Sequence, residues 1–253
     1  MAQVRKPLQG VGNILRFNWH FYALAAGSMV LVGASRYVWP AWGPWALLLL
    51  AAIGVTVGVS LLVSFYVYDV SNLYSLQWLP ERLLAPAGTV VNIHAGFDET
   101  SALLQQRFES SPLVVLDFYD PQLHTEVSIR RARAAYAAYP GTQRVQTHAL
   151  PLADNSADCV FLLLAAHEVR HPRQREAFLR EVHRVLRPAG KLVVVEHLRD
   201  AANFAAYTVG FLHFYSRKTW QRAFAEAGLT LAEEKKITPF VSAFILKRDG
   251  SAA

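Results

Sequence analysis

The chain has 253 residues, a length that allows one large domain or a smaller domain with an appendage. Hydrophobic residues make up 53% of it and charged residues 17%, so its apolar content exceeds that of a typical soluble protein. Its formal net charge of +6 is uneven, since four basic and no acidic residues lie in the first 36 positions and the other 21 basic residues face 19 acidic ones. This distribution suits contact with anionic lipid and calls for no nucleic-acid partner, while the single cysteine, Cys159, excludes an intrachain disulfide and suits a reducing compartment.

Two apolar segments near the N-terminus predict a transmembrane helical hairpin. Residues 17–35 and 37–68 contain no Lys, Arg, Asp or Glu. Within the second segment, the stretch Trp45–Tyr68 is long enough to cross a hydrocarbon core about 30 Å thick as a helix, and aromatic residues lie at both of its ends. The first segment is shorter and is bracketed by Trp19 and Trp39, so a buried or interfacial helix is the alternative for it.

Basic residues predict the orientation of this hairpin. Arg5, Lys6 and Arg16 precede the first apolar segment, and only Arg36 lies beside the turn "WPAWGPW" that joins the two. The positive-inside rule then places the N-terminus and the chain after residue 69 in the cytoplasm. A secretory signal peptide is rejected, because no small-residue cleavage site ends a single apolar run.

We therefore expect a multi-pass protein of the inner (cytoplasmic) membrane. Its predicted parts are a cytoplasmic segment at 1–18, a transmembrane hairpin at 19–68, a connector at 69–88 and a cytoplasmic domain at 89–253. In the connector, "SNLYSLQWLPERLL" predicts a helix near the membrane surface, broken at Pro80. Gly54 and Gly58 form a G-x-x-x-G, a possible helix-packing face if only between the two spans.

From Thr89 onward, strand-like and helix-like segments alternate. Continuous apolar strands separated by helices favour an α/β fold with a parallel sheet covered on both faces, and two final strands with no helix between them predict an antiparallel hairpin at one edge. Ser216 is the expected N-cap and Gly228 the C-cap of the last helix. The strands are expected at 89–93, 112–118, 144–150, 157–166, 191–197, 229–237 and 241–248, and the helices at 100–108, 125–138, 173–186 and 216–227.

The stretch "TVVNIHAGFDETSALLQ" predicts a nucleotide-type turn at the carboxyl edge of this sheet. Gly96 allows the backbone to approach a ligand without a Cβ, and Thr100 or Ser101 can cap a helix whose N-terminus faces that ligand. Asp117 closes the next strand, with Asp120 in reserve, where a carboxylate can accept hydrogen bonds from a ribose diol.

Two stretches carry a family resemblance. They are "ALPLADNSADCVFLLLAAHEVRHPRQREAFLREVHRVLRPAGKLVVVEH" and "AEAGLTL". The segment 89–247 resembles the class I S-adenosylmethionine-dependent methyltransferases of type 11, which include quinone-biosynthesis methyltransferases. The resemblance covers about two thirds of the chain and implies a Rossmann-like sheet, mostly parallel, with S-adenosylmethionine as cofactor. It does not extend to the hairpin.

The resemblance also implies cofactor-binding positions. The family's D-x-G-x-G-x-G motif falls on Asn92, His94, Gly96 and Asp98, and only Gly96 is retained. Asn92 can still form hydrogen bonds but brings no charge. His94 adds a ring where the methionine part of the cofactor would lie.

Three further positions match the family beyond this turn. Asp117 corresponds to the ribose-binding acid, and Gln146 lies near the acid that contacts the adenine amino group. His167 matches the first histidine of the family's "LHH" turn, and Glu168 replaces the second. His167 could be a general base near neutral pH or a packed, hydrogen-bonded histidine.

Other polar and reactive residues have plainer interpretations. Glu168 and His171 are expected to be solvated or paired with arginines, and Cys159 to lie in the core. The arginines between residues 170 and 187 predict a salt-bridged helix face with Glu176 and Arg180 at i,i+4, rather than a phosphate or RNA site.

An aromatic stripe follows the fifth expected strand. Phe204, Tyr207, Phe211 and Tyr215 recur at helical spacing. They predict either ordinary core packing or a hydrophobic wall for a lipid-like acceptor, since a membrane-fixed enzyme gains most from a substrate dissolved in the bilayer.

The first hypothesis is a membrane-anchored S-adenosylmethionine-dependent methyltransferase that acts on a hydrophobic small molecule, such as a quinone, prenyl or lipid-like compound, with no nucleic-acid or metal partner. The alternatives are a non-catalytic membrane protein that binds a ligand or partner through a methyltransferase-like domain, and a tethered RNA or protein methyltransferase. The enzymatic interpretation needs an open slot at Gly96, whereas a His94 ring filling that slot, or an arginine bound to Asp117, would favour the scaffold.

Overall fold

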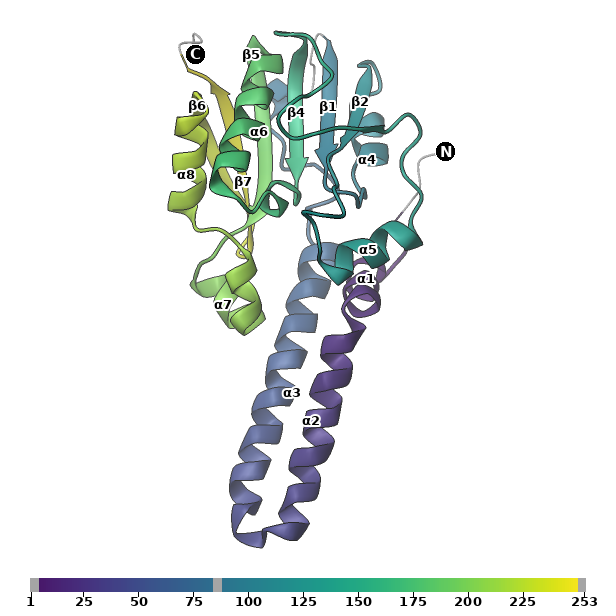
Figure 1. Cartoon of the computed structure of the whole chain (residues 1–253), viewed down its shortest axis with the longest axis vertical. Helices are drawn as coiled ribbons and strands as arrows, with labels where there is room; N and C mark the ends of the chain where they lie inside the picture. Colours follow the sequence, from purple (N-terminus) through teal and green to yellow (C-terminus); the bar gives the residue numbers. More distant parts are fainter. Residues whose placement is uncertain (1–4, 84–87, 250–253) are drawn as a thin grey trace.

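In the computed structural model, which describes residues 5–83 and 88–249, a helical hairpin projects from one edge of an α/β domain (Figure 1). A short helix, α1 (Gln9–Phe17), precedes the hairpin. The hairpin pairs α2 (Trp19–Val38) with α3 (Gly43–Phe65) through the 3-10 turn Pro40–Trp42, and a π-helical turn (Tyr66–Val70) extends α3. By length and composition both long helices could cross a membrane, and almost none of their residues are buried within the chain.

The α/β domain is built on the seven-stranded sheet that the sequence predicts. Its strand order is β3-β2-β1-β4-β5-β7-β6, and every pair is parallel except the two that involve β7. The predicted antiparallel edge hairpin is therefore confirmed. The strands are β1 (Thr89–His94), β2 (Leu113–Asp117), β3 (Gln143–Arg144), β4 (Ala157–Leu163), β5 (Leu186–His197), β6 (Leu229–Thr238) and β7 (Val241–Arg248).

Five α-helices complete the domain, and 3-10 turns link several elements. They are α4 (Ser101–Arg107), α5 (Val127–Ala135), α6 (Pro172–Val185), α7 (Ala201–Tyr207) and α8 (Arg217–Glu226), with 3-10 turns at Glu81–Leu83, Ala166–Glu168 and Thr208–His213. As predicted, Ser216 caps α8 by accepting a hydrogen bond from the Thr219 amide, and Gly228 follows it with a φ of +72°. The Glu176–Arg180 ion pair on α6 is also present, at 2.5 Å.

Several local expectations are wrong. Strand β3 has two residues instead of the seven predicted at 144–150, because the chain turns back at Gln146, whose carbonyl accepts from the Ala149 amide. At α4 neither Thr100 nor Ser101 caps with its side chain. Instead Asp98 Oδ1 accepts hydrogen bonds from both of their amides, each at 2.9 Å. The Asp98 carboxylate, which precedes the helix in the chain, therefore caps its first turn.

The connector is not a helix at the membrane surface. Leu73, Leu76 and Trp78 are buried against the sheet face that α4 covers, and the Trp78 indole donates to the Leu73 carbonyl at 3.0 Å. The helix α4 has seven residues and leaves much of that face open, so the connector's apolar side chains fill it. Leu84, at the end of the predicted helix, lies outside the described residues.

The predicted helix-packing role of the glycines in α3 is not used within the chain. At Gly54 and Gly58 no described atom lies within 4 Å of the position that a Cβ would take. The close helix approach is instead at Gly10 of α1, where a Cβ would fall 2.4 Å from the Cβ of Tyr68. The tight helix contact therefore joins α1 to the end of the hairpin.

A partly buried carboxylate ties the domain to the hairpin. Glu99, in the turn after β1, accepts hydrogen bonds from Arg5 Nη1 at 2.7 Å, from the Tyr74 hydroxyl at 2.9 Å and from the side chains of Gln9 and Asn13. Beside it, Asp69 accepts from two amides in the first turn of α1. Segments on both sides of the hairpin thus converge on the turn that follows β1.

Replacing Glu99 with Ala should reduce the free energy of unfolding by about 3 kcal/mol, because it leaves the partly buried Arg5 guanidinium and the Tyr74 hydroxyl without their acceptor. Thermal unfolding of the detergent-purified chain should show a Tm lowered by roughly 6 to 12 °C. The exposed Glu109→Ala is the matched control and should leave the Tm unchanged. Equal Tm values for both variants would contradict the anchoring role.

Candidate functional site

The turn after β1 contains the residues expected to hold a cofactor. Gly96 adopts a φ of +92°, a conformation that favours glycine. His94 ends β1 with its side chain buried, and its Nδ1 accepts from the Gly96 amide at 3.1 Å. Asn92 is also buried and donates to the hydroxyls of Thr100 and Ser101. The turn thus keeps a nucleotide-type backbone with a histidine ring packed beneath it.

Asp117 lies beside this turn, at the end of β2, and is engaged by an arginine. Arg133 Nη1, from α5, donates to Asp117 Oδ2 at 2.5 Å and to the Gly96 carbonyl at 3.2 Å. A Cβ at Gly96 would fall 2.6 Å from the same nitrogen. The guanidinium therefore occupies the space over the glycine where the sequence predicts an open slot.

The remaining space, here called the Gly96 cleft, has a volume of about 80 Å³. It is lined by His94, Gly96, Asp98, Asp117 and Arg133, together with residues 136–138. Liquid water occupies about 30 Å³ per molecule, so the cleft holds two or three waters in this conformation and excludes a nucleoside. His94 Nε2 and Asp98 Oδ2, both buried, find no hydrogen-bond partner among the described residues, and polar atoms of this kind normally meet water or a ligand.

Gln146 is not part of this cleft. Its residue is exposed and forms one isolated bridge with Ala149, outside the lining of the Gly96 cleft. The side chain of the reserve acid Asp120 accepts from the nearby Gln122 amide and does not line the cleft. Of the predicted cofactor-binding positions, the fold brings together Asn92, His94, Gly96 and Asp117.

A second and much larger space, the hairpin cavity, lies between the carboxyl edge of the sheet and the hairpin helices α2 and α3. Its volume is about 980 Å³, at the upper end of the range for small-molecule sites. Phe21 of α2, Val57 and Ser60 of α3, Ala95 after β1 and Leu164 after β4 all contribute to its wall. The cavity thus joins the predicted active edge of the domain to the hairpin.

The aromatic stripe does not form the wall that its spacing predicts. Helix α7 ends at Tyr207, and Thr208 takes a φ of +47°, which breaks the helical repeat. Only Tyr207 of the four lines the hairpin cavity. Phe204 and Phe211 pack edge to face at 5.0 Å, and Tyr215 packs against Trp220 in the core.

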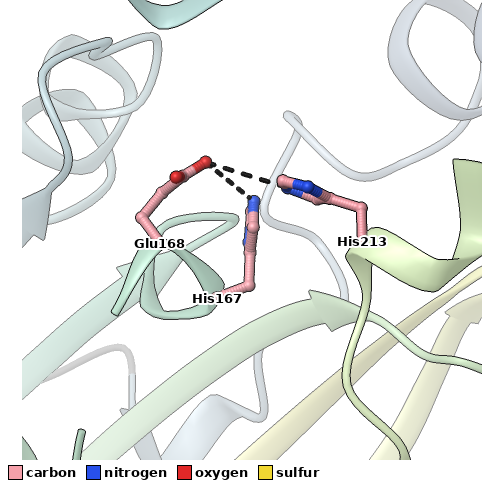
Figure 2. Close-up of side chains that lie close together, drawn as sticks. All are labelled: His167, Glu168 and His213. Carbon is pink, nitrogen blue, oxygen red and sulfur yellow. Dashed lines mark ion pairs between the residues drawn. The ribbon is translucent and has the colours of Figure 1, made fainter. Parts of the chain in front are cut away.

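His167 and Glu168 follow β4 and meet His213, which ends the 3-10 turn after α7. Figure 2 shows the three side chains pointing toward one another. His167 Nε2 lies 3.2 Å and His213 Nε2 lies 3.9 Å from the same oxygen, Glu168 Oε1. All three residues line the hairpin cavity.

Two further carboxylates stand behind the two histidines. His167 Nδ1 lies 2.7 Å from Glu196 Oε2, whose side chain on β5 is fully buried. His213 Nδ1 lies 3.0 Å from Glu126 Oε1. We call these five residues the His–Glu cluster; they converge from four segments of the chain.

The cluster perturbs the ionisation of its members. Burial alone would lower the pKa of His167, but the charge of Glu196 and hydrogen bonds to both glutamates raise it to about 10. Burial alone would raise the pKa of Glu168, but the hydrogen bond and charge of His167 lower it to about 2. His167 is therefore an imidazolium near neutral pH, and in this state it has no free nitrogen with which to act as the predicted general base.

The remaining predicted residues fall outside the chemistry. His171 is exposed at the start of α6. Cys159 is buried in the sheet, and burial raises the pKa of its thiol, so it is an inert core residue as expected.

Sequence reasoning missed Arg133, Glu126, Glu196 and His213. Glu196 gave a usable signal, since a carboxylate inside the apolar strand "KLVVVEH" must find a partner. The other three lie in segments whose placement depends on the packed fold, and no spacing connects them to the strand ends.

Comparison with known proteins agrees with this fold. Residues 92–194 match a family model described as "Methyltransferase domain". No curated protein matches the sequence. A SAM-dependent methyltransferase from Aquifex aeolicus is 14% identical with a TM-score of 0.51 over 76% of this chain and 97% of its own. An O-methyltransferase family 2 protein from Planctomyces limnophilus, in complex with apigenin, is 12% identical with a TM-score of 0.52 over 76% and 61% of the two chains.

At these identities the solved structures establish the fold alone. The match of residues 92–194 to the methyltransferase model implies S-adenosylmethionine as the cofactor. The chain's residues fit that cofactor on one condition. The anchors are present, namely the Asp117 carboxylate, the Gly96 backbone and the unpartnered atoms of His94 and Asp98. The Arg133 side chain, which is 24% exposed, covers them and has to move first.

A buried histidine beside the site predicts a pH-dependent stability. His197 Nδ1 pairs with Asn203 Oδ1 at 3.1 Å and its Nε2 with the Tyr68 hydroxyl at 2.9 Å, so the neutral ring satisfies both nitrogens. Burial lowers its pKa to about 4. Because this folded-state pKa lies below the usual 6.5, the contribution of His197 to stability is complete above pH 6.5 and is lost as the pH falls toward 4, by roughly 3 kcal/mol.

His197→Gln, which does not titrate, should lose less stability than the parent chain between pH 6.5 and 4 when unfolding is followed in detergent. His171→Gln, at the exposed position, should keep the parental dependence. Parallel curves for His197→Gln and the parent would show that His197 is protonated in the folded chain.

Proposed function

We propose that this chain, in which residues 92–194 form a methyltransferase domain, is a membrane-anchored S-adenosylmethionine-dependent methyltransferase that acts on a hydrophobic small molecule. The observation that carries this proposal is the hairpin cavity, which lies between the carboxyl edge of β1 and β4 and the apolar helices α2 and α3. A cavity in this position would suit a quinone-, prenyl- or lipid-like methyl acceptor.

The hairpin supports an anchor in the cytoplasmic membrane, with the domain on the cytoplasmic side. Arg5 and Arg16 precede α2, and Arg36 is the one basic residue near the distal turn. The domain packs on the basic end, because Arg131 on α5 donates to the Phe17 carbonyl at 2.6 Å. The carboxyl edge of the sheet faces the hairpin helices α2 and α3 (Figure 1), which would enter the bilayer under this proposal.

The cofactor supplies an electrophilic methyl group when it is bound. Asp117 would accept hydrogen bonds from its ribose hydroxyls, and the backbone at Gly96 would lie against it. Asn92 and His94 underlie the turn and hold its shape through Thr100, Ser101 and the Gly96 amide. Before the cofactor can bind, the Arg133 side chain has to leave Asp117 and turn into solvent. The ribose hydroxyls then replace the guanidinium as hydrogen-bond donors to Asp117.

The chain's role in the transfer step is alignment and exclusion of water. An imidazolium at His167 removes no proton from an acceptor, and its two N–H groups already face Glu196 and Glu168. At the wall of the hairpin cavity it would therefore act through its positive charge. The apolar wall formed by Phe21, Val57 and Leu164 would hold the aliphatic part of the acceptor.

One observation favours a second function. The Arg133–Asp117 ion pair is the feature expected of a domain that keeps the sheet and binds a ligand or partner without catalysis. The two functions differ in whether adenosyl compounds displace Arg133, which can be measured directly.

Calorimetric titration of the detergent-purified chain with S-adenosylmethionine and S-adenosylhomocysteine should give binding that is lost, or at least tenfold weaker, in Asp117→Ala. Arg133→Ala should bind about tenfold more tightly than the parent, because the guanidinium no longer competes with the ligand for Asp117. A tenfold change in Kd corresponds to about 1.4 kcal/mol. The control is Arg130→Ala, an exposed position on the same helix. If neither the parent nor folded Arg133→Ala binds either compound, the non-catalytic function replaces the enzyme.

Filling the hairpin cavity should exclude its apolar ligand. Val57→Trp places an indole in the cavity wall, and it should weaken the binding of a decyl-substituted quinone, used as the probe, by at least fivefold. Val55→Trp is the matched control, because Val55 is on the same helix, 63% exposed, and outside the lining. Equal effects of the two substitutions would remove the cavity as the acceptor site.

A further inference from the structure

The His–Glu cluster has the construction of a metal site. Histidines that bind metals almost always donate their second ring N–H to a carboxylate or carbonyl, which fixes the ring and leaves the other nitrogen for the metal. His167 Nδ1 faces Glu196 at 2.7 Å and His213 Nδ1 faces Glu126 at 3.0 Å. Both rings therefore direct Nε2 toward the same atom, Glu168 Oε1.

The spacing of these donor atoms suits one ion. One donor atom from each of His167, Glu168 and His213 lies within 4.8 Å of the other two. Bonds of 2.0 to 2.2 Å to a tetrahedral ion place the ligand atoms about 3.3 Å apart, so side-chain movements of about an ångström close the site. Glu196, which pairs with His167, is fully buried on β5. The sheet therefore fixes the position of the His167 ring.

The charge of the cluster points the same way. Glu126, Glu168 and Glu196 bring three negative charges, and Arg170 is the cation that contacts them, 3.3 Å from Glu126. Metal binding would release the proton of the His167 imidazolium, because only the neutral ring binds metals. With both imidazoles neutral, two negative charges are left uncompensated. A divalent cation removes this excess.

We propose that His167 Nε2, Glu168 and His213 Nε2 bind a divalent first-row transition metal, with Glu196 and Glu126 as the carboxylates that orient the two rings. Two histidines and one carboxylate form the ligand set of catalytic zinc sites and of non-haem iron sites, both of which leave positions open. This departs from the expectation of no metal partner, because the ligands come from loops after β4 and after α7 that only the fold brings together.

The open coordination position would face the hairpin cavity, which the three ligands line. An oxygen atom of a molecule held there could complete the coordination, and a hydroxyl bound in this way ionises more readily than a free one. Only this last assignment rests on the proposed methyltransferase function.

Arg170 is the competitor that the metal has to displace. Its Nη2 lies 2.5 Å from both ring nitrogens of His213, and its side chain is 38% exposed. Turning the guanidinium into solvent frees His213 Nε2. Arg170→Ala should therefore bind the metal more tightly than the parent chain.

The test uses the full chain, purified in detergent, stripped with EDTA and then titrated with Zn²⁺ or Co²⁺ without S-adenosylmethionine or any acceptor. The parent should retain one equivalent of Zn²⁺ per chain after dialysis and give the visible bands of four-coordinate Co²⁺. His213→Ala and Glu168→Gln should each weaken binding at least tenfold. His171→Ala, an exposed histidine four residues from His167, should bind like the parent.

Thermal unfolding of each metal-free variant verifies that it is folded, and His213 is partly exposed, so its loss is tolerated. No retained equivalent in the parent, or unchanged binding in both His213→Ala and Glu168→Gln, would overturn the proposal. Because the titration contains no adenosyl compound, its failure leaves the methyltransferase proposal intact, and failure of cofactor binding leaves the metal site intact.

Discussion

The partly buried Glu99 carboxylate is the constraint on which the arrangement of the molecule depends. It belongs to the turn after β1, yet its donors come from the segment before the hairpin and from the connector after it. A carboxylate so placed is stable only while its donors stay with it. The carboxyl edge of the sheet is therefore held against the end of the hairpin nearest the domain, and the large cavity lies where these two parts meet.

Helix α5 links the same junction to the cofactor turn. Arg131 binds the Phe17 carbonyl and the His20 ring, and the Tyr136 hydroxyl donates to Asn13, so one side of the helix is fixed to α1 and α2. From the other side Arg133 reaches Asp117. The arginine that covers the cofactor position is thus carried by the element that contacts the hairpin, and a shift of the hairpin would change how easily it leaves.

The sheet, its antiparallel edge and the position of Asp117 could be predicted, because apolar strand runs and an acid that ends a buried strand are local features. The partners of these residues could not. Arg133 reaches Asp117 only through the placement of α5, and His213 reaches His167 only because Thr208, at a positive φ, ends α7 early. The connector was misassigned for a physical reason: Leu73, Leu76 and Trp78 present one apolar face, and the sequence alone does not distinguish a sheet from a membrane as the surface that covers it.

The loss of glycines from the cofactor motif agrees with the position of Arg133, which covers Gly96 and pairs with Asp117. The Asp117 side chain is 4% exposed, and removing its cationic partner without a replacement would cost several kcal/mol. A closed cleft therefore persists until a ligand offers hydroxyl donors of its own, and the free energy of separating Arg133 from Asp117 is subtracted from the affinity for that ligand. We therefore expect this domain to bind an adenosyl compound more weakly than one with an open glycine turn, with an occupancy that depends on the position of α5.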